Sequence, residues 1–367
     1  MPENKKTCLH SRHVAQGAQM SPFGGFDMPI QYEGITEEHE AVRNRCGVFD
    51  VSHMGEVSVT GPDAERYISR LFTNDVAGAA PGKIFYGMML REDGGTVDDL
   101  LVYKRGENDF FPVINAANID KDLDWMRSQA AGFDVDIVDL SDSMGELAVQ
   151  GPESERVMEE VLGLPCSELT FYTFKELDKD GSHLIVSRTG YTGEDGFEIY
   201  ADHEAICRFW DHLMDSGRCA PCGLGCRDTL RFEVGLPLYG DELTDEITPL
   251  EAGLGIFVKL DKAGGFVGCE ALKKQKAEGL RRKLVGLEIH DRAIARHGCE
   301  VVDRSDGRVI GHVTTGYRGI SVDKSVAMAM IETPYAEKGS EVAVKVRKKT
   351  FPATVTAKKF YKKSYKK

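Results

Sequence analysis

The spacing of apolar positions changes along the chain and divides it into regions of different structure. In residues 59–72 and again in 149–162, a strand ending at glycine precedes apolar residues at i, i+1, i+4 and i+5. That spacing gives one buried helical stripe. Beyond residue 280, short apolar runs alternate with turn residues and leave no room for long helices. The first pattern predicts α/β units, and the second predicts a small all-β barrel or sandwich.

The α/β pattern occurs twice. Val59-Thr-Gly-Pro-Asp-Ala-Glu-Arg66 returns ninety residues later as Val149-Gln-Gly-Pro-Glu-Ser-Glu-Arg156. In both copies proline opens a helix, with acidic residues in the first turn. Two further strand–helix units follow in the same order, beginning at Phe110 and at Phe197. This repetition predicts two related α+β halves up to about residue 235.

Length and composition are those of a multidomain globular protein. The 367 residues suggest two or three domains, and no apolar run approaches the roughly 20 residues of a membrane helix. The first residues resemble neither a signal peptide nor a transit peptide. The nine cysteines are odd in number and scattered, so we expect free thiols in a reducing cytoplasm.

The net charge of −13 is unevenly distributed. Residues 345–367 carry ten Lys and Arg and no Asp or Glu, so the body of the chain is strongly acidic. An acidic body argues against nucleic acid as the main partner. The basic end is either a solvated terminus or a site of attraction for an anionic ligand or an acidic protein.

An acidic pair, Asp98 and Asp99, begins a predicted strand after a Gly-Gly turn. Burying a carboxylate costs several kcal/mol unless it is paired or hydrogen-bonded. By strand alternation the two acids point to opposite faces, and Asp99 shares its face with Val97, Leu101 and Tyr103. One acid of the pair therefore lines an interior. The alternative is an acid that caps the turn, and an EF-hand calcium loop is disfavoured because its order of ligands is missing.

A glycine-rich segment, residues 189–199, leads into a strand that contains Glu198. Its glycines at 190, 193 and 196 allow close approach of the backbone to a ligand. The segment is not a dinucleotide fingerprint, because no helix follows it. Glu198 lies between Phe197 and Ile199, and a carboxylate there suits pairing with the amino–amidine edge of a pterin. The alternative is a strand glutamate that faces solvent.

Cys219, Cys222 and Cys226 form a C-x2-C-x3-C spacing that invites a metal assignment. No fourth Cys or His follows at ligand spacing, and cysteine is also a common small core residue, so we expect no metal. The following helix carries Arg227 and Arg231 on one face. Either arginine binds a ligand carboxylate or pairs with neighbouring acids of the chain.

Read in order, several segments resemble the T-protein (aminomethyltransferase) family of the glycine cleavage system across nearly the whole chain. They are Gly47–Met54, Thr73–Val76, Gly94–Tyr103, Arg188–Glu198, Gly223–Arg231 and Leu238–Gly240. The chain departs from the family pattern at Cys226, where the family often has Ala, and in its Lys-rich end after Phe360.

The resemblance implies an activity. Members of the family take an aminomethyl group from the dihydrolipoyl arm of the lipoylated H-protein, release ammonia and leave the methylene carbon bridging N5 and N10 of tetrahydrofolate. It implies that Asp99 stabilises the cationic state of the reacting carbon and orients the folate amine, with no metal and no membrane involved. Folate contacts are implied for Glu198, which holds the pterin, and for Arg227, Asn115, Val113, Tyr86, Tyr191 and Tyr365.

The resemblance also implies an α+β fold of three domains around a central opening. Residues 1–51 and 137–245 are expected to form a discontinuous first domain, 52–136 an inserted α+β domain, 246–282 a connecting segment, and 283–367 a β-barrel. Two other functions fit the same scaffold, a different tetrahydrofolate-dependent demethylase or methyltransferase and a non-catalytic folate-binding assembly factor for iron–sulfur proteins. The intact Asp98–Asp99 pair argues against the assembly factor.

Overall fold

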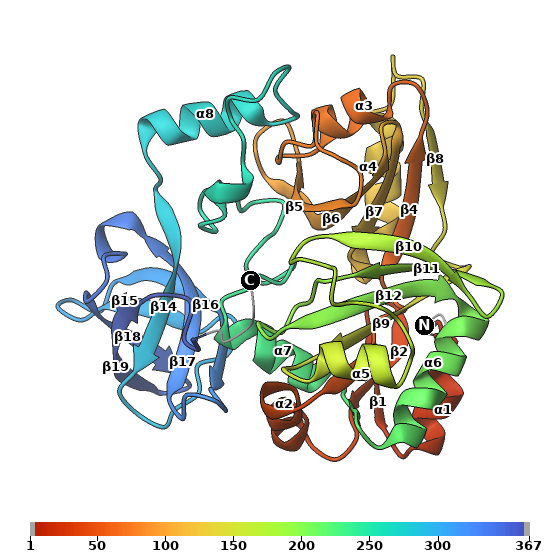
Figure 1. Ribbon diagram of the computed structural model, residues 1–367. Coiled ribbons are helices and arrows are strands. Elements are labelled where there is room, and N and C mark those ends of the chain that lie inside the picture. Colours follow the sequence, from red (N-terminus) through yellow and green to blue (C-terminus); the bar gives the residue numbers. More distant parts are fainter. Residues whose placement is uncertain (1–3, 363–367) are drawn as a thin grey trace.

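The computed structural model describes residues 4–362 and contains a six-stranded mixed sheet, a five-stranded antiparallel sheet, a two-stranded hairpin and a closed barrel. Figure 1 shows the sheets on one side of the molecule and the barrel on the other. The linking segment, residues 234–281 between α7 and β14, carries helix α8 (Cys269–Glu278), which lies above the barrel and toward β5. Helices within these residues are all too short or too polar to cross a membrane. The predicted α+β class with a C-terminal barrel is confirmed.

The larger sheet has six strands and is antiparallel except at its β3–β13 edge. Helices α5 (Ser154–Glu160) and α6 (His203–Ser216) cover one face, and α2 (Ile35–Asn44) and α7 (Leu224–Glu233) pack against part of the other. The strands in sheet order are β10 (Phe174–Lys179), β11 (Ser182–Ser187), β12 (Gly196–Asp202), β9 (Met144–Gln150), β3 (Gly47–Asp50) and β13 (Ala220–Pro221).

The second sheet has five strands, with α3 (Ala64–Leu71) and α4 (Ile119–Ser128) packed on one face. Its strands in sheet order are β5 (Lys83–Leu90), β6 (Thr96–Gly106), β7 (Asp109–Ile114), β4 (Gly55–Thr60) and β8 (Asp136–Asp139). The remaining short elements before the linking segment are α1 (His10–Ala15), the hairpin β1 (Gln19–Phe23) and β2 (Phe26–Gln31), and η1 (Ala116–Asn118).

The two sheets repeat one plan, as the duplicated motif predicts. The order β4-α3-β5-β6-β7-α4 in one half matches β9-α5-β10-β11-β12-α6 in the other, and four strands have the same neighbours in both sheets. Gly61 and Gly151 end the equivalent strands with φ of 126° and 129°. A Cβ at either residue would lie 2.5 or 2.4 Å from a backbone oxygen of Asp134 or Arg45. Glycine is therefore required at both turns.

The uncovered faces of the two sheets pack against each other. Ile84, Tyr103 and Phe111 of the smaller sheet meet Ile185 and Tyr200 of the larger one in a single buried cluster. Because each sheet also buries a face under helices, the pair forms a layered structure with three apolar cores. Polar groups that lie on the shared face are consequently removed from water.

The linking segment contains η2 (Gly255–Phe257) and α8, and it packs with β5, α7 and the barrel in one core cluster. The closed barrel is followed around its circumference as β14 (Arg282–Ile289), β17 (Ser325–Glu332), β16 (Val309–Arg318), β15 (Glu300–Asp303), β18 (Glu341–Val346) and β19 (Lys349–Thr356), with η3 (Thr333–Tyr335) after β17. Each predicted apolar run falls in one of these strands. The domain boundaries given above stay a prediction.

Two buried glutamates occupy equivalent positions of the two halves. Glu56 follows Gly55 on β4, and Glu146 follows Gly145 on β9, ninety residues later. They expose 0% and 3% of their surface, and three of their four carboxyl oxygens have no hydrogen-bond partner among the described residues. Burial raises the pKa of both carboxyls well above the usual range, and Glu198 and Glu56 raise that of Glu146 further. Burial therefore favours the neutral form of both side chains.

This neutrality predicts an alkaline loss of stability. A carboxyl whose folded pKa exceeds its unfolded value contributes fully below the unfolded pKa, about 4.3, and loses that contribution as pH rises through the folded value. In this window the unfolding free energy falls by about 1.4 kcal/mol per pH unit for each such group. Glu56→Gln stays neutral, so its melting temperature should fall less than that of the parent between pH 5 and pH 8. Glu107→Gln, at an exposed turn, is the matched control and should follow the parent. Parallel curves for parent and Glu56→Gln would contradict a neutral Glu56.

Candidate active site

The acid pair lies on β6 next to an irregularity in the sheet. Asp99 pairs with Met88 of β5 and Asp98 with Met89, but the register then shifts and Val97 is left without a partner. An extra residue of this kind reverses the alternation of side chains. Val97 therefore packs in the core under α3 and α4, so the expectation that it shares a face with Asp99 is wrong.

Asp98 and Asp99 differ in their surroundings. Asp98 is fully buried, and its carboxylate accepts the backbone N–H of Asn115 at 3.0 Å, Asn115 Nδ2 at 2.8 Å and Asn118 Nδ2 at 2.8 Å. Asp99 is partly exposed. Its Oδ2 accepts the Tyr86 hydroxyl at 2.8 Å, and its Oδ1 accepts Asn115 Nδ2 at 3.2 Å. Asn115 thus connects the interior acid to the accessible one.

Asp99 has a pKa suited to proton exchange near neutrality. Burial, and then the charge of Asp98, raise the pKa of Asp99 to about 7, while the hydrogen bonds from Tyr86 and Asn115 oppose the rise. Burial raises the pKa of Tyr86 well above its usual range, so its hydroxyl keeps its proton and remains a donor. The pair Tyr86–Asp99 therefore combines a fixed donor with a titrating acceptor.

Glu198 lies inside the larger sheet and exposes only 5% of its surface, which excludes the alternative of a solvent-facing glutamate. Thr189 Oγ1 donates to its Oε2 at 2.5 Å. Burial raises the pKa of Glu198, whereas this hydrogen bond and the positive charge of Arg227 lower it. Glu198 is thus a buried acid with acceptor capacity left for a ligand.

Arg227 differs from Arg231 four residues later on the same helix. Arg231 is completely buried and engaged by Asp228 at 2.6 Å and Glu242 at 2.7 Å, so it holds the fold together. The Arg227 guanidinium lies 4.8 Å from the centre of the Tyr191 ring, and its buried Nη1 has no hydrogen-bond partner among the described residues. Of the two, Arg227 is the one with a donor available for a ligand.

The glycine-rich loop is shaped by an internal side chain. A Cβ at Gly190 or Gly196 would lie 2.0 or 2.3 Å from the buried Gln150 side chain, which donates to the Thr189 carbonyl at 3.0 Å and accepts the Thr192 hydroxyl at 2.9 Å. Those two glycines therefore make room for Gln150 rather than for a ligand. Gln150 in turn fixes the loop that presents Thr189 to Glu198 and Tyr191 to Arg227.

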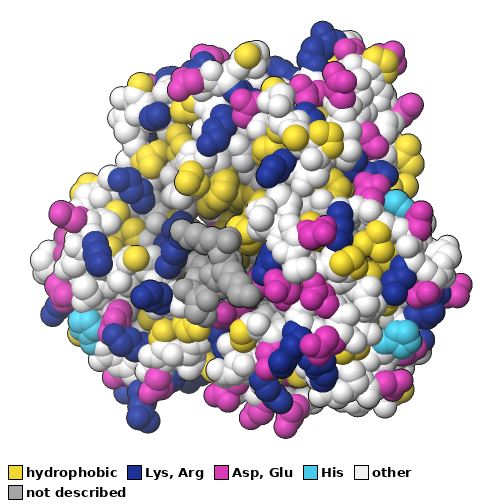
Figure 2. Space-filling view, in the orientation of Figure 1, with side chains coloured by type: hydrophobic (Ala, Val, Ile, Leu, Met, Phe, Trp, Pro, Cys, Tyr) yellow, Lys and Arg dark blue, Asp and Glu magenta, His cyan; other side chains and the backbone are white. Residues whose placement is uncertain are grey.

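A chain of contacts joins the two candidate acids. Tyr191 lies near enough to Asp99 for that charge to raise the pKa of its hydroxyl, after the larger effect of burial, and its ring stacks on Arg227. Arg227 in turn lowers the pKa of Glu198. The structure thus brings Asp99, Tyr86, Asn115, Tyr191, Arg227 and Glu198 to one region. The face shown in Figure 2 is hollowed near its centre, between the barrel and the two sheets, with hydrophobic side chains gathered there.

Val113 and Tyr365 are two further residues for which the resemblance implies contacts with folate. Val113 is 4% exposed and packs in the apolar cluster between the sheets, so its side chain contributes to the core. Tyr365 lies outside the described residues. The chain is described up to Lys362, and it is anchored there by Phe360 and Tyr361, whose backbone N–H groups both donate to the Glu233 carbonyl.

Motif reasoning missed several residues that complete the site. Thr189 gives Glu198 its hydrogen bond, and Asn118 gives Asp98 its third. Phe257 of the linking segment lies edge-on to Tyr86, with ring centres 4.8 Å apart. Asn118 could have been found from the sequence, because it follows a predicted strand closely. The Phe257 contact joins segments 171 residues apart, and no local pattern predicts it.

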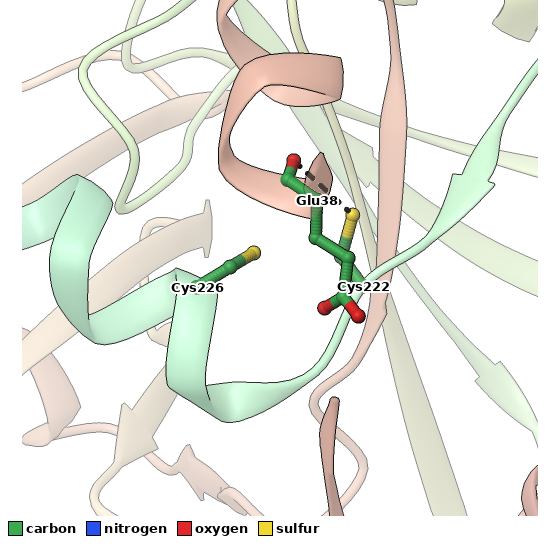
Figure 3. Close-up of side chains that lie close together, drawn as sticks. All are labelled: Glu38, Cys222 and Cys226. Atoms are coloured by element: carbon green, nitrogen blue, oxygen red, sulfur yellow. Dashed lines mark hydrogen bonds between the residues drawn. The ribbon is translucent and has the colours of Figure 1, made fainter. Parts of the chain in front are cut away.

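One further acid, Glu38, lies beside the cysteine motif. Figure 3 shows Glu38 of α2 beside Cys222 and Cys226, whose ligand atoms all lie within 4.8 Å of one another. The Glu38 carboxylate already accepts the backbone N–H groups of Tyr32 at 2.6 Å and Gly223 at 2.7 Å. Burial and the neighbouring Cys226 thiol raise the pKa of Cys222 well above its usual range. A cation here would have to displace backbone donors and ionise a resistant thiol, so the donor set fits a packing role better.

Known proteins resemble the chain over its whole length. Residues 9–262 match the GCVT N-terminal domain family model, and residues 282–362 match the glycine cleavage T-protein C-terminal barrel domain. An aminomethyltransferase of Alkaliphilus oremlandii is 48% identical over 371 aligned residues, and one of Clostridium botulinum is 47% identical over 370, each covering 100% of both chains. The crystal structure of glycine cleavage system aminomethyltransferase T from Bartonella henselae superposes with a TM-score of 0.94 at 34% identity, covering 99% of both chains.

Two related sheets followed by a closed barrel are the fold that the chain shares with a glycine cleavage system aminomethyltransferase T. Relatives of the same length share nearly half of the residues. The chain belongs to the aminomethyltransferase family of the glycine cleavage system. The family and the class of enzyme expected from the motifs are confirmed.

The position of Glu198 predicts a loss of folate affinity when its charge is removed. Hydrogen bonds to a charged group contribute about 1.5–3 kcal/mol, so Glu198→Gln should weaken the binding of tetrahydrofolate about 10- to 100-fold in calorimetry. Glu168→Gln, on an 84% exposed side chain, is the control and should bind as the parent does. Equal affinity of Glu198→Gln and parent would remove Glu198 from the folate site.

Proposed function

We propose that the protein transfers the methylene carbon of an aminomethyl group from the dihydrolipoyl arm of the H-protein to tetrahydrofolate. The products are 5,10-methylenetetrahydrofolate, ammonia and the dihydrolipoyl thiol. Membership of the aminomethyltransferase family supports this class of reaction. The observation that carries the site assignment is the placement of Asp99, an acid of pKa about 7 held between Tyr86 and Asn115.

In this proposal Asp99 acts by charge and by proton exchange. The ionised carboxylate stabilises the positive charge that develops on the carbon between sulfur and nitrogen, and it accepts a hydrogen bond from the attacking folate amine. The folate loses two N–H protons, one of which ends on the sulfur and the other on the ammonia nitrogen. An acid that titrates near neutrality is suited to pass them on. Tyr86 and Asn115 fix the orientation of the carboxylate before ligands arrive, so little reorganisation is needed in the transition state.

The second half of the chain supplies the groups that hold the folate. Glu198 is placed to pair with the amino–amidine edge of the pterin, and the free Nη1 of Arg227 is placed to donate to an oxygen of the ligand. The ring of Tyr191 packs against the guanidinium group of Arg227. No step of the proposal requires a metal ion, because the carboxylate of Asp99 stabilises the developing positive charge and Arg227 serves only to hold the ligand.

We place the enzyme in the cytoplasm with the lipoylated H-protein as its partner. All nine cysteines are free thiols, which suits a reducing compartment. The acidic body of the chain disfavours nucleic acid, and we propose no membrane partner.

One assay separates this function from its alternatives. Aminomethylated H-protein and tetrahydrofolate are supplied together, and ammonia and methylene-folate are measured in the same reaction. Equal amounts of both products are expected. A demethylase on this scaffold would instead turn over a methylated amine and leave the H-protein conjugate intact, and an assembly factor would bind folate without turnover.

Removing the charge of Asp99 should separate binding from turnover. Asp99→Asn keeps the shape and one acceptor, so tetrahydrofolate affinity should stay within about 3-fold, while kcat falls about 100- to 1,000-fold, the range for loss of a positioned acid–base group. Glu92→Gln, an exposed acid before the same turn, should have parental kcat. Unchanged turnover of Asp99→Asn would reject the catalytic assignment.

The pKa of Asp99 also predicts the pH dependence of catalysis. If the ionised carboxylate is the active form, kcat/KM for tetrahydrofolate should fall about tenfold per pH unit below about 7, because kcat/KM reports the free enzyme. The profile is measured at fixed ionic strength from pH 5 to 9. Asp99→Asn should lose this limb in its residual activity. A parental profile that stays flat down to pH 5 would be incompatible with the assignment.

A further inference from the structure

A third acid lies behind the Asp98–Asp99 pair. Asp122 on α4 is 0% exposed, and neither of its carboxyl oxygens has a hydrogen-bond donor among the described residues. The nearest cation, Lys121, is 3.8 Å away, and its Nζ is occupied by the Val97 carbonyl and by the Tyr239 hydroxyl at 3.0 Å. An ionised Asp122 would be a buried charge with no hydrogen-bond donor among the described residues, and burial outweighs the attraction of Lys121, so the neutral carboxylic acid is favoured.

The acceptor for the proton of Asp122 is Asp98. The two carboxyl groups are within hydrogen-bonding reach, and burial together with Asp98 raises the pKa of Asp122 to about 11. Asp98 already receives three N–H groups, from Asn115 and Asn118. An O–H from Asp122 would be its fourth donor, and a carboxylate has about four lone-pair positions to fill. The protonated Asp122 completes the shell of Asp98.

We propose that Asp122 is a positioning residue for the transfer reaction, donating its carboxyl O–H to Asp98 and thereby holding Asp98 and Asn115 in the arrangement that orients Asp99. The mechanical link is Asn115 Nδ2, which lies 2.8 Å from Asp98 Oδ1, 3.0 Å from the Asp99 carbonyl and 3.2 Å from Asp99 Oδ1. If Asp98 rotates, Asn115 follows and Asp99 loses one of its two side-chain donors. The inference rests on the proposed catalytic role of Asp99.

An electrostatic consequence accompanies the mechanical one. The charge of Asp98 is the second cause, after burial, of the raised pKa of Asp99. The hydrogen bond from Asn115 opposes this rise, so the loss of that donor raises the pKa of Asp99 further. The other titratable groups that face this set are Tyr86 from β5, Lys121 from α4, Tyr191 from the glycine-rich loop and Tyr239 from the linking segment.

Two variants of Asp122 distinguish positioning from packing. Asp122→Asn keeps the size and an N–H donor for Asp98, whereas Asp122→Leu keeps the size and removes the donor. We expect Asp122→Asn to retain kcat within about 3-fold and the parental pH profile. Asp122→Leu should lose about 10-fold or more in kcat, the effect of one hydrogen bond to a charged group, with KM for tetrahydrofolate changed less than about 3-fold. Its acidic limb should move to higher pH, because Asp99 loses the hydrogen bond from Asn115 that lowers its pKa. Asp124→Asn, on the exposed side of the same helix, is the matched control and should resemble the parent.

A purely structural role gives a different pattern. If Asp122→Leu lowers only the melting temperature and keeps the kcat and pH profile of the parent, the inference is overturned. It is also overturned if Asp122→Asn is as impaired as Asp122→Leu. Should Asp122→Leu fail to fold, Asp122→Ala replaces it with the same expected outcomes, because the smaller side chain introduces no new contact.

A spectroscopic test reports on Asp122 without any turnover. In the ligand-free protein at pH 7, the difference infrared spectrum of parent minus Asp122→Asn should contain the carbonyl band of one protonated carboxylic acid. Its absence would refute a neutral Asp122. This measurement stands even if Asp99→Asn proves fully active, which would reject the proposed role of Asp99 and leave the protonation of Asp122 established or refuted on its own.

Discussion

Burial of carboxyl groups within the two related sheets and under the helix α4 is the constraint on which the site depends. Removing a charged carboxylate from water costs several kcal/mol, and the protein meets that cost in two ways. Asp98 and Glu198 receive hydrogen bonds, three for Asp98 and one from Thr189 for Glu198. Glu56 and Asp122 have no hydrogen-bond donor among the described residues, one oxygen of Glu146 is without a partner there, and burial raises the pKa of all three. Asp99 is partly exposed and has a pKa of about 7, so it can change its charge readily near neutral pH.

The frame that holds these acids is built by long-range contacts between rigid elements. Tyr86 lies on β5 and Asn115 directly follows β7, the two strands that flank β6, so the sheet sets their distances to Asp99. Phe257 braces Tyr86 from the linking segment, and Gln150 braces the loop that carries Tyr191 and Thr189. A carboxylate held on both sides before the ligand arrives needs little reorganisation during reaction, which is the physical basis of electrostatic stabilisation of a transition state.

The sequence predicted the parts of this arrangement that follow from local patterns. The repeated motif gave the two halves because each copy encodes its own strand, glycine turn and helix, and the alternating runs gave the barrel. Asp99 and Glu198 stood out as charges within apolar strands. The position of Val97 was not predictable, because a single unpaired residue reverses the alternation without any mark in composition. Asp122 stands among Asp120, Lys121 and Asp124 on a polar helix, and only the packed structure distinguishes it from its exposed neighbours.

The two halves share a frame but divide the chemistry. Glu56 and Glu146 stand at the same place in each sheet, yet the acid pair occurs only on β6, and its counterpart β11 continues through Leu184, Ile185 and Val186. Conversely, the buried Glu198 lies on β12, whereas the equivalent strand β7 is apolar from Phe110 to Ile114. The first half thus presents Asp99, the acid that titrates near neutral pH, and the second half presents Glu198 and Arg227. A duplicated sheet can hold such different groups because its geometry is set by backbone pairing and apolar packing, which leave the side chains on the shared face free to differ.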